Sequence, residues 1–115
     1  MANLNEVKLI GRLTRDVEFS ATSSGTSLAK FGLATSRKYK ETEETTFVDI
    51  TAWGKLADIC SQYLSKGSNV YLGGRLKLDT WEDKDGNRRQ KLSVVAENVQ
   101  FLDSKKQDNR EEPPF

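Results

Sequence analysis

The 115-residue chain is long enough to form one domain with its own hydrophobic core, and its 30% charged residues nearly cancel to a net charge of +1. The absence of histidine excludes most acid–base catalysis and most zinc sites, so we expect no enzymatic activity, no metal and no cofactor. A single cysteine, and the lack of a signal-like or membrane-length apolar run, favour a cytoplasmic location.

Alternating side chains predict three strands in the first half of the chain. Residues 7–19 (VKLIGRLTRDVEF) form the first strand, and the turn-forming segment 21–27 (ATSSGTS) reverses the chain into a second strand at 28–39. A charged loop at 40–45 then leads to a third strand at 46–53 (TFVDITAW). One face of each strand is apolar, and these faces should form the core: Val7, Leu9, Leu13, Ala29, Phe31, Leu33, Val48, Ile50 and Ala52.

The second half adds one helix and two strands. Residues 55–67 have apolar side chains at helical spacing, and Lys66 followed by Gly67 is typical of a helix end. Strands at 69–83 and 88–102 flank an Asp-Gly turn, and a glycine pair in the first of them marks a bend. The core-facing residues predicted here are Leu56, Ile59, Cys60, Tyr63 and Leu64 on the helix, and Val70, Leu72, Gly74, Leu76 and Leu78 on the next strand.

This order of elements is the plan of the OB-fold, a five-stranded Greek-key barrel. An SH3-like barrel would not normally carry a three-turn helix at this place, and an α+β sandwich of the same elements is the alternative architecture. We therefore expect an all-β fold with one helix between strands 3 and 4, covering residues 1–102. Residues 103–115 lack periodicity and are predicted to form a short disordered tail.

Four aromatic residues lie on or beside the polar faces of the predicted strands. Phe47 and Trp53 share the non-core face of the third strand, Tyr39 ends the second strand, and Trp81 lies on the non-core face of the fourth. A single aromatic on a strand usually packs against protein, but their joint placement favours a surface on which unpaired bases stack. We predict that Tyr39, Phe47, Trp53 and Trp81 stack unpaired bases of a single-stranded nucleic acid.

Basic residues on the same surface are candidates for contacts with phosphates, although about half of such residues are expected to be ordinary solvent-exposed charges that contact no ligand. The predicted phosphate contacts are Lys8, Arg12, Lys30, Arg37, Lys55, Arg75, Lys77 and Arg89, and Lys38, Arg88 and Lys91 are further available cations. Two alternatives remain. The module could prefer RNA through the 2′-hydroxyl, or its aromatic face could dock on a partner protein.

The landmarks NEVKLIGRLTRD, FGLATSRKY and TFVDITAWGKLADICSQYLSKGSNVYLGGRLKLDTWEDKDGNRRQKLSVV resemble the bacterial single-stranded DNA-binding protein (SSB) family over residues 3–102. The resemblance implies an OB-fold that assembles as a homotetramer and wraps single-stranded DNA without sequence preference. It also implies a role in protecting DNA during replication, recombination and repair, at the nucleoid.

The resemblance implies residue roles as well. It assigns base stacking to Tyr39, Phe47, Trp53 and Trp81, and it gives Lys55, Tyr63 and Tyr71 counterparts at family positions. Asp49 and Asp79 depart from the family, since some relatives carry arginine there, and should weaken phosphate contact locally. The outward apolar residues Ile10 and Val48 are candidates for a subunit interface.

The chain ends in an acidic tip, EEPPF, comprising Glu111, Glu112, Pro113, Pro114 and Phe115. An apolar side chain beside a terminal carboxylate suits a partner pocket that has a basic rim. The resemblance implies that this tip recruits replication and repair proteins.

Overall fold

The structure, a computed structural model, describes residues 1–103, so the acidic tip lies outside the described residues. Six strands and one helix follow in order: β1 (Val7–Leu13), β2 (Glu18–Ala21), β3 (Ser27–Tyr39), β4 (Thr42–Trp53), α1 (Gly54–Tyr63), β5 (Asn69–Glu82) and β6 (Arg88–Phe101).

The strands form one closed barrel. Their order is β1-β5-β6-β4-β3-β2, and a further pairing between β1 and β3 closes the sheet on itself. β1 pairs with β3 at Leu33 and Ala34, while β2 pairs with residues 27–30 of the same strand. β1 and β2 are therefore two pieces of one barrel strand. The predicted five-stranded OB barrel, with its helix between the third and fourth barrel strands, is confirmed.

The prediction of one continuous strand over residues 7–19 was wrong. The backbone of Thr14 donates to the carbonyl of Gly32 at 3.0 Å, and the carboxylate of Asp16 accepts from the backbone N–H of Lys66 at 2.8 Å. Because Asp16 bonds to the loop that follows the helix, residues 14–17 turn there instead of extending the strand.

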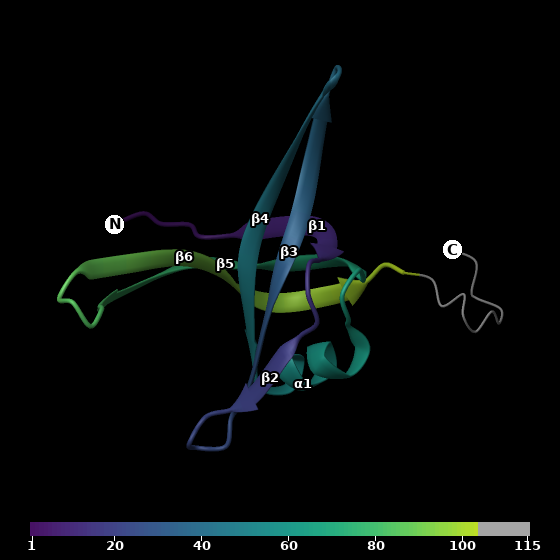
Figure 1. Ribbon diagram of the computed structural model, residues 1–115. Helices are drawn as coiled ribbons and strands as arrows, with labels where there is room; N and C mark the ends of the chain where they lie inside the picture. The colour runs from purple at the N-terminus through teal and green to yellow at the C-terminus, as the bar shows by residue number, and fades with distance from the viewer. Residues whose placement is uncertain (104–115) are drawn as a thin grey trace.

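Two long hairpins project from the barrel as arms (Figure 1). The β3–β4 arm comprises residues 36–47, with pairing that continues to Tyr39 and Thr42. The β5–β6 arm comprises residues 75–92, with pairing that continues to Glu82 and Arg88. The predicted charged loop at 40–45 is therefore only a tight turn, since β4 begins at Thr42.

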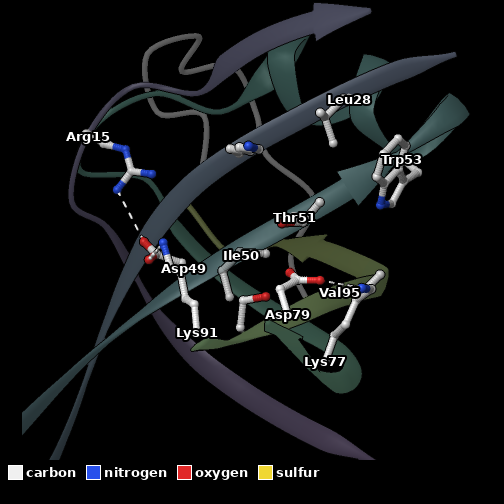
Figure 2. Close-up of a pocket in the computed structure, with 12 residues that line it drawn as sticks. Arg15, Leu28, Asp49, Ile50, Thr51, Trp53, Lys77, Asp79, Lys91 and Val95 are labelled. Atoms are coloured by element: carbon white, nitrogen blue, oxygen red, sulfur yellow. Dashed lines mark hydrogen bonds and ion pairs between the residues drawn. The ribbon is translucent and has the colours of Figure 1, made fainter. Parts of the chain in front are cut away.

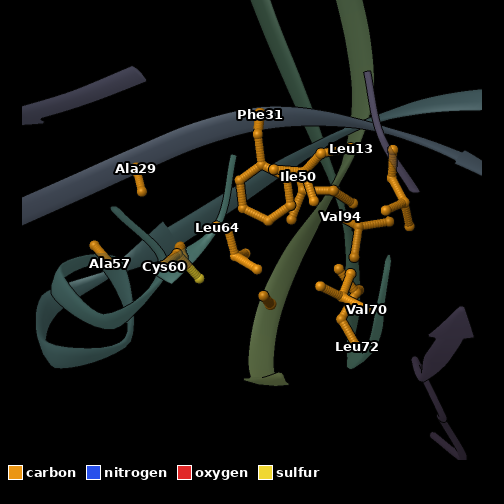
Figure 3. Close-up of a cluster of buried hydrophobic side chains, with 13 residues drawn as sticks. Leu13, Ala29, Phe31, Ile50, Ala57, Cys60, Leu64, Val70, Leu72 and Val94 are labelled. Carbon is orange, nitrogen blue, oxygen red and sulfur yellow. The ribbon is translucent and has the colours of Figure 1, made fainter. Parts of the chain in front are cut away.

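The core lies inside the barrel and against one side of α1 (Figure 3). The residues of β3, β4 and β5 that were predicted to face inward within the barrel are buried: Ala29, Phe31, Leu33, Ile50, Ala52, Val70 and Leu72. The helix adds Ala57 and Cys60, and Leu64 follows its end. Burial raises the pKa of the Cys60 thiol to about 11, in keeping with the predicted structural role of that residue.

Three of the predicted core positions are exposed, namely Leu76, Leu78 and Tyr63. Leu76 and Leu78 are 42% and 53% exposed because β5 has left the barrel at that point and its alternation continues onto the uncovered arm. Tyr63 is exposed as well, with its ring centroid 5.7 Å from that of Phe101. Val48, proposed above as an outward interface residue, packs partly buried against the core, whereas Ile10 is exposed as predicted.

The helix is shorter than predicted. α1 ends at Tyr63, and Leu64 is already extended, with its N–H bonded to the carbonyl of Cys60 at 3.0 Å. The backbone N–H of Gly67 instead donates to the carbonyl of Leu13 at 2.9 Å, across the barrel end. Lys66 and Gly67 thus belong to the turn that leads into β5, not to a helix cap.

Candidate nucleic-acid interface

A groove of about 320 Å³ crosses β3, β4, β5 and β6 on the surface of the barrel (Figure 2). Ile50, Ser93 and Val95 contribute its buried surface. Trp53 stands at one side of the groove. Its charged side chains are Arg15, Lys30, Asp49, Lys77, Asp79 and Lys91.

Strand alternation explains how these side chains come together. Along β4, Asp49, Thr51 and Trp53 point away from the core that Ile50 and Ala52 fill. β4 runs parallel to β6, which places Thr51 beside Val95. The groove is therefore the non-core face of β4 joined to the neighbouring strands. This is the face on which the sequence predicted a ligand surface.

The four predicted stacking aromatics are all exposed: Trp53 by 45%, Trp81 by 48%, Tyr39 by 65% and Phe47 by 71%. Only Trp53 lines the groove itself. Phe47 lies on the same face of β4, further along the β3–β4 arm, and Trp81 lies on the same face of β5 as Lys77 and Asp79. The face that carries the groove thus continues onto both arms.

The remaining aromatic candidates lie elsewhere. Tyr39 is at the end of β3 with the Lys40 ammonium 5.3 Å from its ring centroid, and alternation puts it on the face of β3 opposite to Lys30. Tyr71 is half-buried and pairs with Ile10 on β1 and Gln100 on β6. Neither of these tyrosines, nor Tyr63, lines the groove.

The structure brings two of the eight predicted phosphate contacts to the groove, namely Lys30 and Lys77. It adds Lys91, which the sequence offered only as an available cation, and Arg15, which sequence reasoning missed. The other predicted contacts are outside the groove: Lys8 and Arg12 on β1, Arg37 on the β3–β4 arm, Lys55 on α1, Arg75 paired with Glu97 at 2.9 Å, and Arg89 paired with Asp83 at 2.8 Å.

Two carboxylates hold most of the groove's cations in ion pairs. Asp49 accepts from Lys91 at 2.6 Å and lies 3.6 Å from the Arg15 guanidinium. The hydrogen bond from Lys91 holds the pKa of Asp49 below its usual value of 3.8, and both cations add to the effect. Asp79 pairs with Lys77 on its own strand at 2.6 Å. These are the two aspartates that were expected to weaken phosphate contact.

The residues that the structure describes hold no group of three or more histidine, cysteine or acidic side chains arranged to bind a metal ion. Within the same residues, no helix has the length and apolar character needed to cross a membrane.

The profile described as "Single-strand binding protein family" matches residues 4–102 of the chain. A single-stranded DNA-binding protein of Wolinella succinogenes is 48% identical over 106 residues, which is 88% of this chain and 65% of the relative. One from Helicobacter pylori is 44% identical over 110 residues, 91% of this chain and 61% of the relative. Single-stranded DNA-binding protein 2 of Clostridium acetobutylicum is 39% identical over 115 residues, 97% of this chain and 86% of the relative. The chain thus spans less than two thirds of the length of the Wolinella succinogenes and Helicobacter pylori relatives.

Proposed function

The chain belongs to the single-strand binding protein family, and from this premise we propose that it binds single-stranded DNA without sequence preference. The family is one of binding proteins, in line with our proposal that this chain is not an enzyme. In the cell, the chain would cover and protect DNA during replication, recombination and repair.

One observation carries the proposal: a half-exposed tryptophan stands in a groove beside four cations. Trp53 offers an aromatic face to any base, and the cations Arg15, Lys30, Lys77 and Lys91 lie where a phosphate backbone could follow. Every base has such a face, so stacking holds a strand without selecting its sequence. A duplex offers no free base faces, because its bases are paired and stacked on one another.

The two arms extend the binding surface. Trp81 continues the groove face along the β5–β6 arm, and Phe47 continues it along the β3–β4 arm. We assign both a stacking role, with Tyr39 as a further platform at the end of its arm. Arg89 pairs with Trp81 on the β5–β6 arm, and Arg37 lies on the same face of β3 as Tyr39, so each would contact phosphates beside one of these platforms.

The assembly and the protein partners are part of the proposal. Leu76, Leu78 and Leu92 expose an apolar strip on one face of the β5–β6 arm, and Ile10 is exposed on β1. Contiguous exposed apolar surface of this kind is usually buried in an interface with another chain, which supports the homotetramer implied by the family resemblance. The acidic tip, Glu111 to Phe115, would recruit replication and repair proteins.

A competition titration tests the proposed function. Labelled oligo-dT is bound to the protein, and unlabelled oligo-dT, oligo-rU of equal length and duplex DNA are added in turn. We expect oligo-dT to compete strongly and duplex DNA weakly, because only the former exposes stacking faces. Stronger competition by oligo-rU would make the protein an RNA-binding module instead. Absence of binding to oligo-dT would leave the aromatic face as a protein interface.

A further inference from the structure

The cations of the groove are mostly engaged by the protein's own carboxylates. Asp49 binds Lys91 at 2.6 Å and lies 3.6 Å from Arg15, while Asp79 binds Lys77 at 2.6 Å (Figure 2). Arg15 also lies 3.7 Å from Glu18. Among the ion pairs formed by residues 1–103, none involves Lys30, so Lys30 is the groove cation that remains available to a phosphate.

Asp49 is placed to compete with a phosphate for the same cations. It lies on the groove face of β4, between Phe47 and Trp53, where the backbone of a strand stacked on those rings would pass. Because Asp49 and Lys91 belong to one folded chain, their pair forms without the loss of translational and rotational freedom that a binding phosphate strand must undergo. Asp49 would also repel the incoming phosphate directly.

Lys91 reaches Asp49 from the neighbouring strand. It projects from β6, while Asp49 projects from β4, and the parallel pairing of these strands at Ile50 with Val94 and at Thr51 with Val95 brings the two side chains within reach of each other. Neither residue lies in a turn or at a chain end: Asp49 lies within β4, and Lys91 lies in β6 at the base of the β5–β6 arm. A cation held in this way is withheld from the ligand unless the pair is broken.

We propose that Asp49 withholds Lys91 and Arg15 from phosphate and thereby sets the affinity of the groove for single-stranded DNA below what its cations would otherwise give. This inference rests on the proposed function and concerns the same site. It assigns Asp49 a role in tuning affinity and Trp53 the main share of binding in the groove. It also implies that few phosphate contacts form there, and so a shallow dependence of affinity on salt.

The test is a mutant cycle between Asp49→Asn and Lys91→Ala, with affinity for labelled oligo-dT measured over a range of salt concentrations. Asparagine keeps the size of the side chain and removes its charge. We expect Asp49→Asn to bind about fivefold more tightly, the scale of one exposed ion pair. The slope of log affinity against log salt should steepen by about 0.7 for each cation released to a phosphate.

Lys91→Ala should weaken binding more in the Asp49→Asn background than in the parent protein, because only there is Lys91 free of Asp49. It should leave in that background the share of the gain that comes from Arg15. Glu6→Gln is the matched control, since it changes net charge equally from an exposed position outside the groove. It should leave both affinity and slope close to those of the parent.

Three results would overturn the inference. Unchanged binding by Asp49→Asn would show that its ion pairs do not limit affinity. Weaker binding would mean that Asp49 positions Lys91 for the ligand. An equal gain from Glu6→Gln would assign the effect to net charge alone. Failure of the proposed function would look different, because the parent protein itself would then not bind oligo-dT.

Discussion

Two adjacent glycines in β5 should respond very differently to the same substitution. A Cβ added at Gly74 would lie 2.0 Å from the backbone carbonyl oxygen of Val95, whereas one added at Gly73 would meet the ends of two side chains, Asn98 Nδ2 at 3.1 Å and the Tyr71 hydroxyl at 3.2 Å. The pairing of β5 with β6 shifts register between these two glycines, where β5 leaves the barrel for the arm.

The distances around the two glycines set the expected loss of unfolding free energy in each variant. To relieve the contact in Gly74→Ala, two paired backbones must separate by more than about 1 Å, and overpacking of this kind typically costs about 1–3 kcal/mol. Part of that cost is recovered because alanine is favoured over glycine in strands by about 0.5–1 kcal/mol. We therefore expect Gly74→Ala to lose about 2 kcal/mol of unfolding free energy and Gly73→Ala to change it by less than about 1 kcal/mol in either direction.

Urea unfolding at one fixed protein concentration measures both variants, since stability depends on concentration if the subunits assemble. The midpoint for Gly74→Ala should fall by about 1 M relative to the parent, and that for Gly73→Ala should stay close to it. Equal midpoints for the two variants would refute the reasoning, because the close backbone approach at Gly74 would then carry no cost.

Three further predictions concern the core, the thiol and the arms. Phe31→Ala should cost about 3–5 kcal/mol in urea unfolding, because the ring is fully buried and its removal leaves a cavity; a loss below about 1 kcal/mol would contradict that burial. Cys60, with a pKa raised from 9.0 to about 11, should react slowly with a thiol reagent at pH 8 until the protein unfolds. Because the thiol has a higher pKa in the folded protein than in the unfolded chain, its contribution to stability is complete below pH 9 and is lost as the pH rises towards 11. Thermal unfolding of the parent protein and of Cys60→Ala at pH 8 and pH 10 should show a larger fall in melting temperature for the parent. Tyr39→Ala and Phe47→Ala should weaken binding of labelled oligo-dT without lowering the unfolding midpoint, because both rings are exposed on the β3–β4 arm; a lowered midpoint with unchanged binding would make them structural.

The barrel was predictable where one face of a strand is covered. Ala29, Phe31 and Leu33 alternate with exposed or small residues, and all three are buried as the period of two predicts. The same alternation misled at Leu76 and Leu78, which continue the pattern beyond the barrel. A sequence pattern shows which face is apolar, but it does not show where the covering layer ends.

The split of the first strand could not be read from its residues alone. Residues 7–19 alternate well enough for one strand, but Asp16 bonds to the backbone of Lys66, which is distant in sequence. The end of α1 was missed for a related reason. Lys66 and Gly67 have the composition of a helix end, and the bond from Gly67 to Leu13 places them in the barrel-closing turn instead.

The candidate site was predictable in part. The exposure of Trp53 and Trp81 followed from strand alternation, and the structure confirms it, while their contact with DNA stays a prediction. The groove's cations were harder to choose, because Lys91 and Arg15 come close to Asp49 only when β6 and the loop after β1 fold against β4. Asp49 itself carried a signal in the sequence, as an acid between two outward aromatics.

Quenching of tryptophan fluorescence by oligo-dT tests the central claim most directly, namely that outward aromatics stack unpaired bases. The chain has two tryptophans, so its emission reports on Trp53 and Trp81 alone. We expect strong quenching in the parent, and in Trp53→Ala a loss of about 1–3 kcal/mol in binding of labelled oligo-dT, the value of one stacked base. Binding without quenching, together with unchanged affinity in the Trp53→Ala, Trp81→Ala double variant, would contradict the account.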